Sequence, residues 1–330
     1  MGPKTELNTY VPDVVSVAKN WEDGNVLCTE CKQPVALNKE LCLQIQKCPL
    51  CGKPFFVLKK VGKYFLYEPC GSGGMGSVYK ALKMNDPDNV FAVKVLSREM
   101  RENPGDIYAL LNEARIGTNF AKSEFIAACI DYGFDDDEYY VVMRFVPGER
   151  LDKLLSRIHK MPEKPAIQMA LHILAAEQHI YKKGFLFRDL KPENIIISPD
   201  GYAVLIDFGL CITCEQAKTC LDEFVSGSPY YLPPERLLGT GESVCSELYS
   251  LGMVLYEALT GKTYFDSGEI ESLARRHVSN LRISNTAKMK GLRPSVGALL
   301  ESLIRKQPEN RPQTFKEVAD AVKAILAEMG

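Results

Sequence analysis

Two pairs of cysteines near the start of the chain have the spacing of a metal site. The four thiols are those of Cys28, Cys31, Cys48 and Cys51, with sixteen residues between the two Cys-x-x-Cys pairs. Each pair can present two thiolates on one tight turn, and Gly52 lets backbone amides point at the sulfurs. Paired knuckles at this separation are typical of a four-cysteine Zn²⁺ site. The pattern predicts a zinc ribbon over residues 25–58, with Cys42 in its core and not a ligand.

The charge of this segment bears on what the ribbon binds. Residues 1–62 contain eight Lys and six Asp or Glu, a formal net charge of +2. Four thiolates and one Zn²⁺ add −2, so the ribbon is about neutral and a poor match for a phosphate backbone. We therefore expect a structural, docking or regulatory ribbon with a protein partner and no nucleic acid. A segment this small needs the metal for its folding energy.

Three further cysteines lie close together later in the chain: Cys211, Cys214 and Cys220. They could form a redox pair, part of a metal site, or ordinary packing. Three thiols without a fourth ligand at suitable spacing favour packing.

A glycine-rich run, CGSGGMGSVY at residues 70–79, lies between two strand-like segments. Dinucleotide-binding folds use the same glycines before a helix, but strands on both sides predict a β-hairpin whose amides can approach phosphates. Fifteen residues after Tyr79, Lys94 ends the apolar run FAVK. A buried lysine needs an anionic partner, and Glu113 on the following helical stretch is available. The alternative is a Lys94 that extends from an edge strand into water.

Three more motifs follow in order. Residues 187–194 read FRDLKPEN before the strand-like IIIS, residues 207–209 read DFG after AVLI, and residues 232–235 read LPPE. With the glycine run and Lys94, they resemble the protein kinase family, specifically its Ser/Thr type. The resemblance covers about residues 60–328, and the glycine run looks most like bacterial kinases.

The resemblance implies an α+β, bilobal protein kinase fold preceded by the zinc ribbon. We expect an N-terminal arm over 1–24, loosely ordered, the ribbon over 25–58, and a kinase domain over 63–328. Its strand-rich lobe would span about 63–145 and its helical lobe about 149–328, with a hinge near 144–148 and a cleft between the lobes.

The resemblance also implies roles for single residues, with Mg²⁺ or Mn²⁺ and ATP as cofactors. Lys94, held by Glu113, would bind the α- and β-phosphates, Asp189 would accept the hydroxyl proton, and Lys191 would neutralise charge on the γ-phosphoryl group. Asn194 and Asp207 would hold the metal. The residues expected around the nucleotide are Gly71, Ser72, Gly73, Gly74, Met75, Gly76, Val78, Ala92, Met143, Arg144, Val146 and Ile196. Substrates would be proteins with Ser or Thr acceptors, the enzyme itself included.

The chain departs from the family pattern at four positions: Phe187, Ser228, Pro233 and Glu247. Glu247 stands where an Asp is expected, and its extra methylene could disturb hydrogen bonds to the catalytic-loop backbone. Ser228 keeps a hydroxyl that would bridge Asp189 and Lys191. None of the four removes a charged catalytic group, so an active kinase is favoured over a nucleotide-binding pseudokinase scaffold. Arg311 resembles the family's buried partner of Glu235.

The sequence offers several candidate sites for regulation by phosphorylation. Arg188, before Asp189, is typical of kinases whose activation loop is ordered by a phosphate. The candidate acceptors are Thr213, Thr219 and Ser226, of which Thr219 is the favoured hypothesis. Asp222 and Glu223 could instead supply permanent negative charge.

Composition and periodicity complete the prediction. The 330 residues carry a net charge of −2 and are 46% hydrophobic, ordinary values for a globular protein, with no internal repeat apparent. No stretch has the length and apolarity of a membrane span or signal peptide, so a cytoplasmic protein is expected. Helical periodicity predicts helices over 105–120, 151–158, 165–183, 244–260, 268–279, 295–306 and 314–327.

Overall fold

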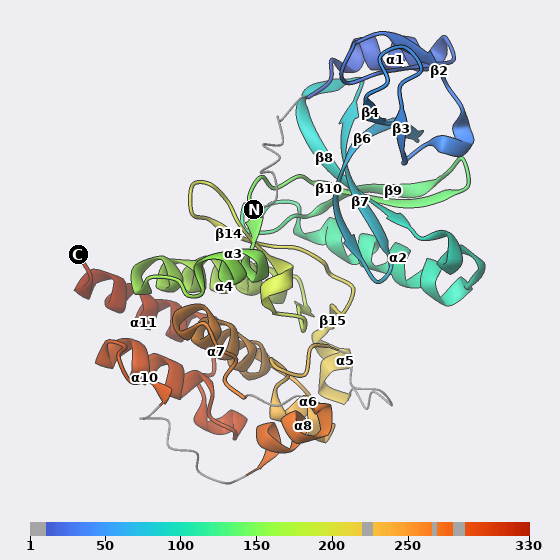
Figure 1. The fold of residues 1–330 in the computed structure, drawn as a ribbon. Helices are drawn as coiled ribbons and strands as arrows, with labels where there is room; N and C mark the ends of the chain where they lie inside the picture. The colour runs from blue at the N-terminus through green and yellow to red at the C-terminus, as the bar shows by residue number, and fades with distance from the viewer. Residues whose placement is uncertain (1–10, 220–226, 266–268, 280–287) are drawn as a thin grey trace. The chain divides into compact units, whose positions relative to one another are not determined.

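The computed structural model describes residues 11–219, 227–265, 269–279 and 288–330. They form two compact units (Figure 1). The first comprises the described residues up to 111 together with 129–145, and the second comprises 112–128 and 146–330. Helix α2 (Pro104–Gly117) contributes residues to both.

The first unit begins with a helix and two short hairpins. The helix is α1 (Val14–Glu22), and the hairpins pair β1 (Asn25–Leu27) with β2 (Pro34–Ala36) and β3 (Ile45–Lys47) with β4 (Pro54–Phe56). Corresponding strands start 20 residues apart, so the expectation of no internal repeat is wrong for the ribbon. The repeat escapes sequence inspection because only the cysteines and one proline recur at that offset.

Helix α1 corrects the expectation of a loosely ordered arm over residues 1–24, of which 1–10 lie outside the described residues. The Asp13 carboxylate caps the helix by accepting hydrogen bonds from the N–H groups of Val15 and Ser16. Val14, Val17 and Ala18, at helical spacing, are all buried. The burial of this apolar face outweighs the polar composition of the segment.

A six-stranded antiparallel sheet follows, in the order β5-β6-β7-β8-β10-β9. Its strands are β5 (Lys59–Val61), β6 (Tyr64–Gly73), β7 (Gly76–Lys83), β8 (Asp86–Leu96), β9 (Cys129–Asp135) and β10 (Glu138–Arg144). The strand-like segments predicted on both sides of the glycine-rich run are confirmed as β6 and β7. Alternation puts Val93 and Val95 of β8 in the core and leaves Ala92 and Lys94 on the half-buried face.

The ribbon and the sheet share one hydrophobic core. Cys28 and Cys48 are buried in the same cluster as Phe65 and Leu82 of β6 and β7. The indole of Trp21 in α1 packs edge-on against Phe65, with ring centroids 6.4 Å apart. The ribbon is therefore part of the first unit's packing.

The second unit is mainly helical, as its periodicity predicts. Its helices are α3 (Leu151–Ile158), α4 (Glu163–Lys182), α5 (Cys214–Thr219), α6 (Pro234–Leu238), α7 (Val244–Thr260), α8 (Ile270–Val278), α10 (Pro294–Leu303) and α11 (Phe315–Glu328). Short strands are β11 (Glu149–Arg150), β12 (Phe185–Leu186), β13 (Ile195–Ile197), β14 (Ala203–Leu205) and β15 (Ile212–Thr213), of which β11, β13 and β14 form one sheet.

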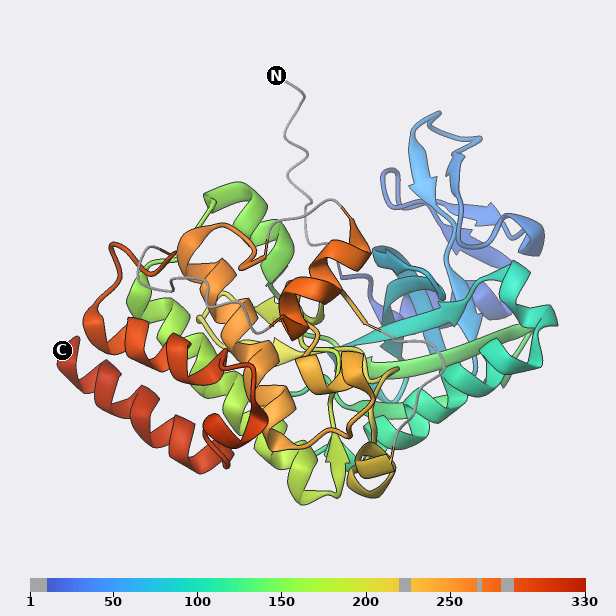
Figure 2. The ribbon, with the colours of Figure 1, turned by 90° about the horizontal axis from the view of Figure 1, so that it is seen from below.

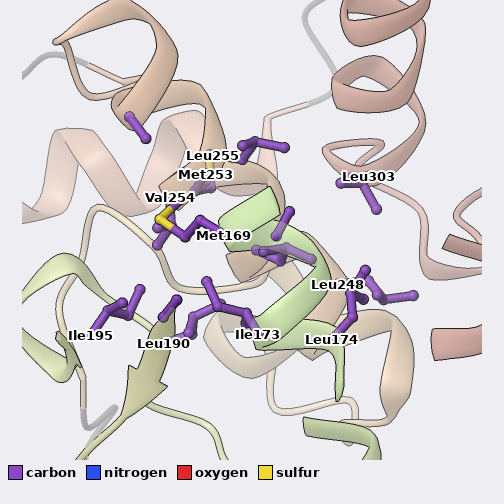
Figure 3. Packing of buried hydrophobic residues seen from close by; sticks show 14 of the residues in the cluster. Met169, Ile173, Leu174, Leu190, Ile195, Leu248, Met253, Val254, Leu255 and Leu303 are labelled. Carbon is purple, nitrogen blue, oxygen red and sulfur yellow. The ribbon is translucent and has the colours of Figure 1, made fainter. Parts of the chain in front are cut away.

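Helix α7 lies at the centre of this unit, because it is apolar nearly all round and almost wholly buried. It packs against α4 and α10, and α11 lies along α4 (Figure 2). Figure 3 shows Leu190, within the predicted catalytic loop (residues 187–194), and Ile195, directly after it, in one group with Ile173 of α4 and Val254 of α7. Core side chains within the loop and just after it thus anchor it.

These observations confirm the α+β fold class. In the part of the chain that is described, none of the helices has both the length and the apolar run that crossing a membrane requires.

Candidate active site and metal centre

The four predicted cysteine ligands come together at the tips of the two ribbon hairpins. Their sulfur atoms all lie within 4.8 Å of one another. The Sγ atoms of Cys28 and Cys51 are 3.9 Å apart, and those of Cys31 and Cys48 are 3.8 Å apart. Four thiolates placed tetrahedrally about 2.3 Å from Zn²⁺ are separated by about 3.8 Å, so the cluster fits this ion.

Both knuckles have the same backbone geometry. The N–H of Lys32 donates to the Cys28 carbonyl, and the N–H of Gly52 donates to that of Cys48. Lys32 and Gly52 have left-handed φ values of 60° and 72°. The sequence signals this turn only at Gly52, since lysine has no preference for that conformation.

At Cys48 the backbone also favours the thiolate form, whereas at Cys31 a backbone hydrogen bond that lowers the pKa is outweighed by burial and the neighbouring cluster thiols, which raise it to about 11. Burial opposes ionisation of Cys48, but N–H groups of Cys51 and Leu50 point at its sulfur and lower the pKa of the thiol to about 7. Cys42 stands outside the cluster, in the ribbon core, where burial raises the pKa of its thiol. The prediction that Cys42 is not a ligand agrees with this placement.

In the first unit, the glycine-rich run forms the predicted hairpin. Strands β6 and β7 pair up to Gly73 and Gly76, with Gly74 and Met75 in the turn. Gly76 has a φ of 154°, and a Cβ there would lie 2.0 Å from the Val95 carbonyl oxygen. Only glycine fits this approach of two backbones.

The sheet register places the expected nucleotide-binding side chains of this unit on one face. Val78 lies directly opposite Lys94, and Ala92 lies opposite Met143. Since Ala92 and Lys94 are two residues apart on β8, all four share that face. Arg144 ends β10 beside them.

In the second unit, the catalytic loop forms a tight hydrogen-bonded group around Asp189. The Lys191 ammonium is 2.7 Å from Asp189 Oδ2. The Asn194 amide nitrogen donates to the same oxygen at 2.7 Å and to the Asp189 carbonyl at 2.9 Å. Among the described residues, Asp189 Oδ1 and the Asn194 amide oxygen accept no hydrogen bond and are available to other groups.

The strands explain why Asn194 and Asp207 lie together. Asn194 directly precedes β13, Asp207 follows the end of β14, and Ile195 pairs with Leu205 across the two strands. The N–H of Ile206 donates to the Asn194 carbonyl at 3.0 Å. A carboxylate and an amide oxygen at neighbouring strand ends are the donor types that Mg²⁺ prefers.

Three further expected residues belong to this unit. Glu113 of α2 is buried, and a Cβ at Gly209 would lie 3.9 Å from its carboxylate oxygen. Val146 and Ile196 lie in one small apolar cluster with Val204. Glu113 is thus near the DFG segment, and Ile196, in strand β13, packs beside Val146, where the second segment of this unit begins.

Glu247 supports the catalytic loop despite its extra methylene. Both of its carboxylate oxygens accept the N–H of Arg188, at 3.1 Å each. The loop backbone is therefore held at the residue before Asp189, and the disturbance considered from the sequence is not observed.

A second buried carboxyl faces Glu247. Glu177 of α4 is 1% exposed, and among the described residues neither of its oxygens meets a hydrogen-bond donor. Burial raises the pKa of Glu177 well above its usual value, and the charge of Glu247 raises it further. Burial likewise raises the pKa of Glu247 to about 7, against the opposing charge of Arg236. Two facing buried carboxyls cannot both be ionised, so the pair retains a proton.

We expect Glu177→Gln to become increasingly more stable than wild type as pH rises. The unfolded Glu177 carboxyl ionises near pH 4.5, whereas the folded one stays protonated. The contribution of Glu177 to folding stability is therefore complete below pH 4.5 and decreases as the pH rises towards the folded pKa. The difference in free energy of unfolding should grow by about 1.4 kcal/mol per pH unit until the folded pKa is reached. Urea unfolding at several pH values from about 5 to 8, with the exposed Glu301→Gln as control, measures it. Parallel curves for wild type and Glu177→Gln would contradict the protonated pair.

Arg188 has a buried counter-ion that the sequence analysis did not identify. Its guanidinium lies 2.7 Å from Glu242, and Arg236 binds the other oxygen of the same carboxylate. Arg236 also donates to the Arg188 carbonyl at 2.7 Å. The cluster ties the catalytic loop to the segment after α6. No motif marked Glu242, since its role depends on long-range contact.

The expected Glu235–Arg311 pair is confirmed. Two guanidinium nitrogens of Arg311 bind the two Glu235 oxygens at 2.7 and 2.9 Å, and both residues are buried. Ser246 adds a 2.6 Å hydrogen bond to Glu235. This bidentate pair joins α6 to the segment before α11.

The activation segment is described only in part. Thr219 is exposed at the end of α5, and the Thr213 hydroxyl hydrogen-bonds to Gln216.

Cys211 is buried and donates to the Leu186 carbonyl, whereas Cys214 begins α5. The Lys191 ammonium contacts the Asp189 carboxylate directly. Among the described residues, no hydrogen bond joins the Ser228 hydroxyl to Asp189 or to Lys191, so the bridge expected from the sequence is not observed. The other residues considered, Cys220, Asp222, Glu223 and Ser226, lie outside the described residues.

Comparison with known proteins identifies the family. The protein kinase domain model matches residues 64–322. Over 263 residues the chain is 30% identical to a probable serine/threonine-protein kinase of Clostridium perfringens, covering 80% of this chain and 38% of that protein. It is 33% identical to PknA of Mycobacterium tuberculosis, in a match that covers 81% of this chain and 62% of PknA. It is 30% identical to PrkC of Bacillus subtilis, in a match that covers 80% of this chain and 40% of PrkC. The matches span less than two thirds of these curated relatives. The chain therefore belongs to the protein kinase family and is similar to its bacterial serine/threonine members.

Proposed function

We propose that this protein transfers the γ-phosphoryl group of Mg-ATP to serine or threonine hydroxyls of proteins, itself included. The observation that carries the proposal is the Asp189 carboxylate, held between Lys191 and Asn194, with one oxygen that accepts no hydrogen bond from any described residue. The relatives are named serine/threonine kinases, which supports the same reaction class.

The chemistry follows from the positions of these groups. The acceptor hydroxyl hydrogen-bonds to Asp189, its oxygen attacks the γ-phosphorus, and its proton passes to the Asp189 carboxylate. The bond from the γ-phosphorus to the bridging oxygen breaks, and ADP leaves. Lys191 stabilises negative charge on the group in transit, and Lys94 binds the α- and β-phosphates. Mg²⁺ held by Asn194 and Asp207 would neutralise phosphate charge.

The pseudokinase alternative differs in one respect. A scaffold binds nucleotide without transferring phosphate, and its partners would be recruited through the ribbon. Retention of Lys94, Asp189 and Asp207 favours the enzyme. We also propose that the ribbon is a structural part of the strand-rich unit, because the two share a core. A protein docking partner for it stays a prediction.

For regulation, the Arg188–Glu242 contact supports an enzyme whose catalytic loop is ordered before phosphorylation. Glu242 supplies the negative charge that a phosphate would otherwise offer to Arg188. Phosphate at the exposed Thr219 would then tune activity rather than create it.

Lys94→Ala is expected to lower kcat/KM for ATP by about 10²–10³-fold, because an ammonium positioned at the phosphates is lost. The measurement is transfer from labelled ATP with Mg²⁺, with phosphosites mapped by mass spectrometry to show whether Thr219 is modified. Lys83→Ala, at the far end of β7, is the control and should leave the rate unchanged. Nucleotide binding without transfer in the wild-type protein would instead favour the scaffold.

A further inference from the structure

A cavity of about 220 Å³ lies within the first unit, between the ribbon and the sheet. The ribbon side is formed by the turn from Lys39 to Gln44, and Lys59 of strand β5 in the sheet also lines the cavity. The other side is formed by β7 at Ser77 and Tyr79, by the end of β8, and by the short 3₁₀ turn Arg98–Glu102. The cavity exists only because the ribbon packs on the sheet, and it contains none of the expected catalytic residues.

The lining of the cavity is strongly cationic. Four of its side chains are Lys39, Lys59, Arg98 and Arg101, and its single carboxylate is Glu138, a formal net charge of +3. Asp136, 3.7 Å from Lys39 and 3.5 Å from Lys59, lowers this to +2. The positive charge therefore exceeds what the protein itself neutralises.

A buried ion pair gives this lining a rigid base. The Glu138 carboxylate is 3% exposed and accepts from Lys59 at 2.6 Å and from Arg101. Arg101 also donates to the carbonyls of Leu96 and Asp137. Lys59 and Arg101 are consequently held at the wall, with little freedom to fold back into solvent.

Three donors in the lining have no acceptor among the described residues: the Ser77 and Tyr79 hydroxyls and the guanidinium of Arg98, an exposed residue. Hydroxyl and guanidinium donors together are the groups that bind phosphate oxygens, and a dianion would balance the +2 charge. The volume is below the usual range of about 300–1,000 Å³ for drug-sized ligands, so a nucleotide is too large.

We propose that this cavity binds a phosphate monoester dianion, with Arg98 as the principal contact and Tyr79 as a hydroxyl donor. The ester could be a small free metabolite or a phosphorylated side chain, since both present the same group. The ligand would lie against the end of β8, the strand that carries Lys94, and against the turn that leads into α2. Such a ligand can stabilise the arrangement of the strand-rich unit in its bound form.

The test is calorimetric titration with inorganic phosphate, O-phosphoserine and a short phosphoserine peptide. The protein carries Asp189→Asn and is saturated with a non-hydrolysable ATP analogue, so that neither transfer nor the nucleotide site contributes. We expect saturable binding that Arg98→Ala weakens roughly tenfold or more, because one charge-assisted hydrogen bond is lost. Tyr79→Phe should weaken it less while keeping the ring contact with Phe56. Arg275→Ala, an exposed arginine on α8, should have no effect.

The outcomes are distinct. Equal binding of O-phosphoserine and the peptide identifies the free ester as sufficient, and binding of the peptide alone identifies a phosphorylated side chain. Absence of binding up to about 10 mM of all three probes, or equal affinity in Arg98→Ala and wild type, overturns the proposal. Because no phosphoryl transfer is measured, these results are independent of whether the protein is an active kinase.

Discussion

Asp189→Asn is expected to reduce phosphoryl transfer by about 10²–10⁴-fold while leaving ATP affinity nearly unchanged. Asparagine keeps an oxygen that can accept from Lys191 and Asn194, so the loop geometry survives. The amide cannot take the hydroxyl proton, and so the acceptor oxygen is left protonated during attack. The loss should therefore appear in kcat rather than in the KM for ATP.

Initial rates and nucleotide binding on the same preparations measure this effect. Asp200→Asn is a matched control, because Asp200 is exposed in the turn between β13 and β14 and makes the same change of charge. Equal rates for Asp189→Asn and wild type would show that another group handles the proton. Loss of ATP binding in Asp189→Asn would show that the substitution had altered the fold of the site.

Removal of the predicted zinc ligands is expected to have the second large effect. Cys48→Ser with Cys51→Ser should abolish zinc binding and unfold the ribbon, because structural Zn²⁺ contributes about 10–16 kcal/mol in isolated zinc fingers. Here the damage should extend further, since Cys28 and Cys48 share a core with Phe65 and Leu82 of the sheet. We expect a lower Tm and rapid proteolysis of residues 25–58.

Metal analysis, thermal unfolding and limited proteolysis together measure this prediction. Cys42→Ala is the control, because Cys42 is buried in the same core but stands outside the cluster. It should keep one zinc per chain and lose only packing energy, about 1 kcal/mol for a small buried side chain. A double variant with wild-type Tm and an intact ribbon would mean that packing on the sheet suffices without metal.

Local motifs made much of this protein predictable. The two cysteine knuckles, the glycine hairpin, and the Asp189, Asn194 and Asp207 positions each depend on residues within a few places of one another. Such short-range patterns encode a turn or a strand end directly, because the backbone geometry is set by the residues themselves. Helical periodicity likewise located α4 and α11, whose buried faces repeat every three to four residues.

Only the tertiary structure revealed the groups whose roles come from distant partners. Glu242 holds Arg188 across 54 positions, and Glu177 faces Glu247 from another helix. A single carboxylate looks the same in a sequence whether it is solvated or buried, so its charge state depends on which elements pack around it. The same holds for α1 and for the cationic cavity, both of which exist because the ribbon docks on the sheet. The sequence thus determined the candidate reacting groups, and packing decided which residues support them, because burial and long-range contact arise only in the folded chain.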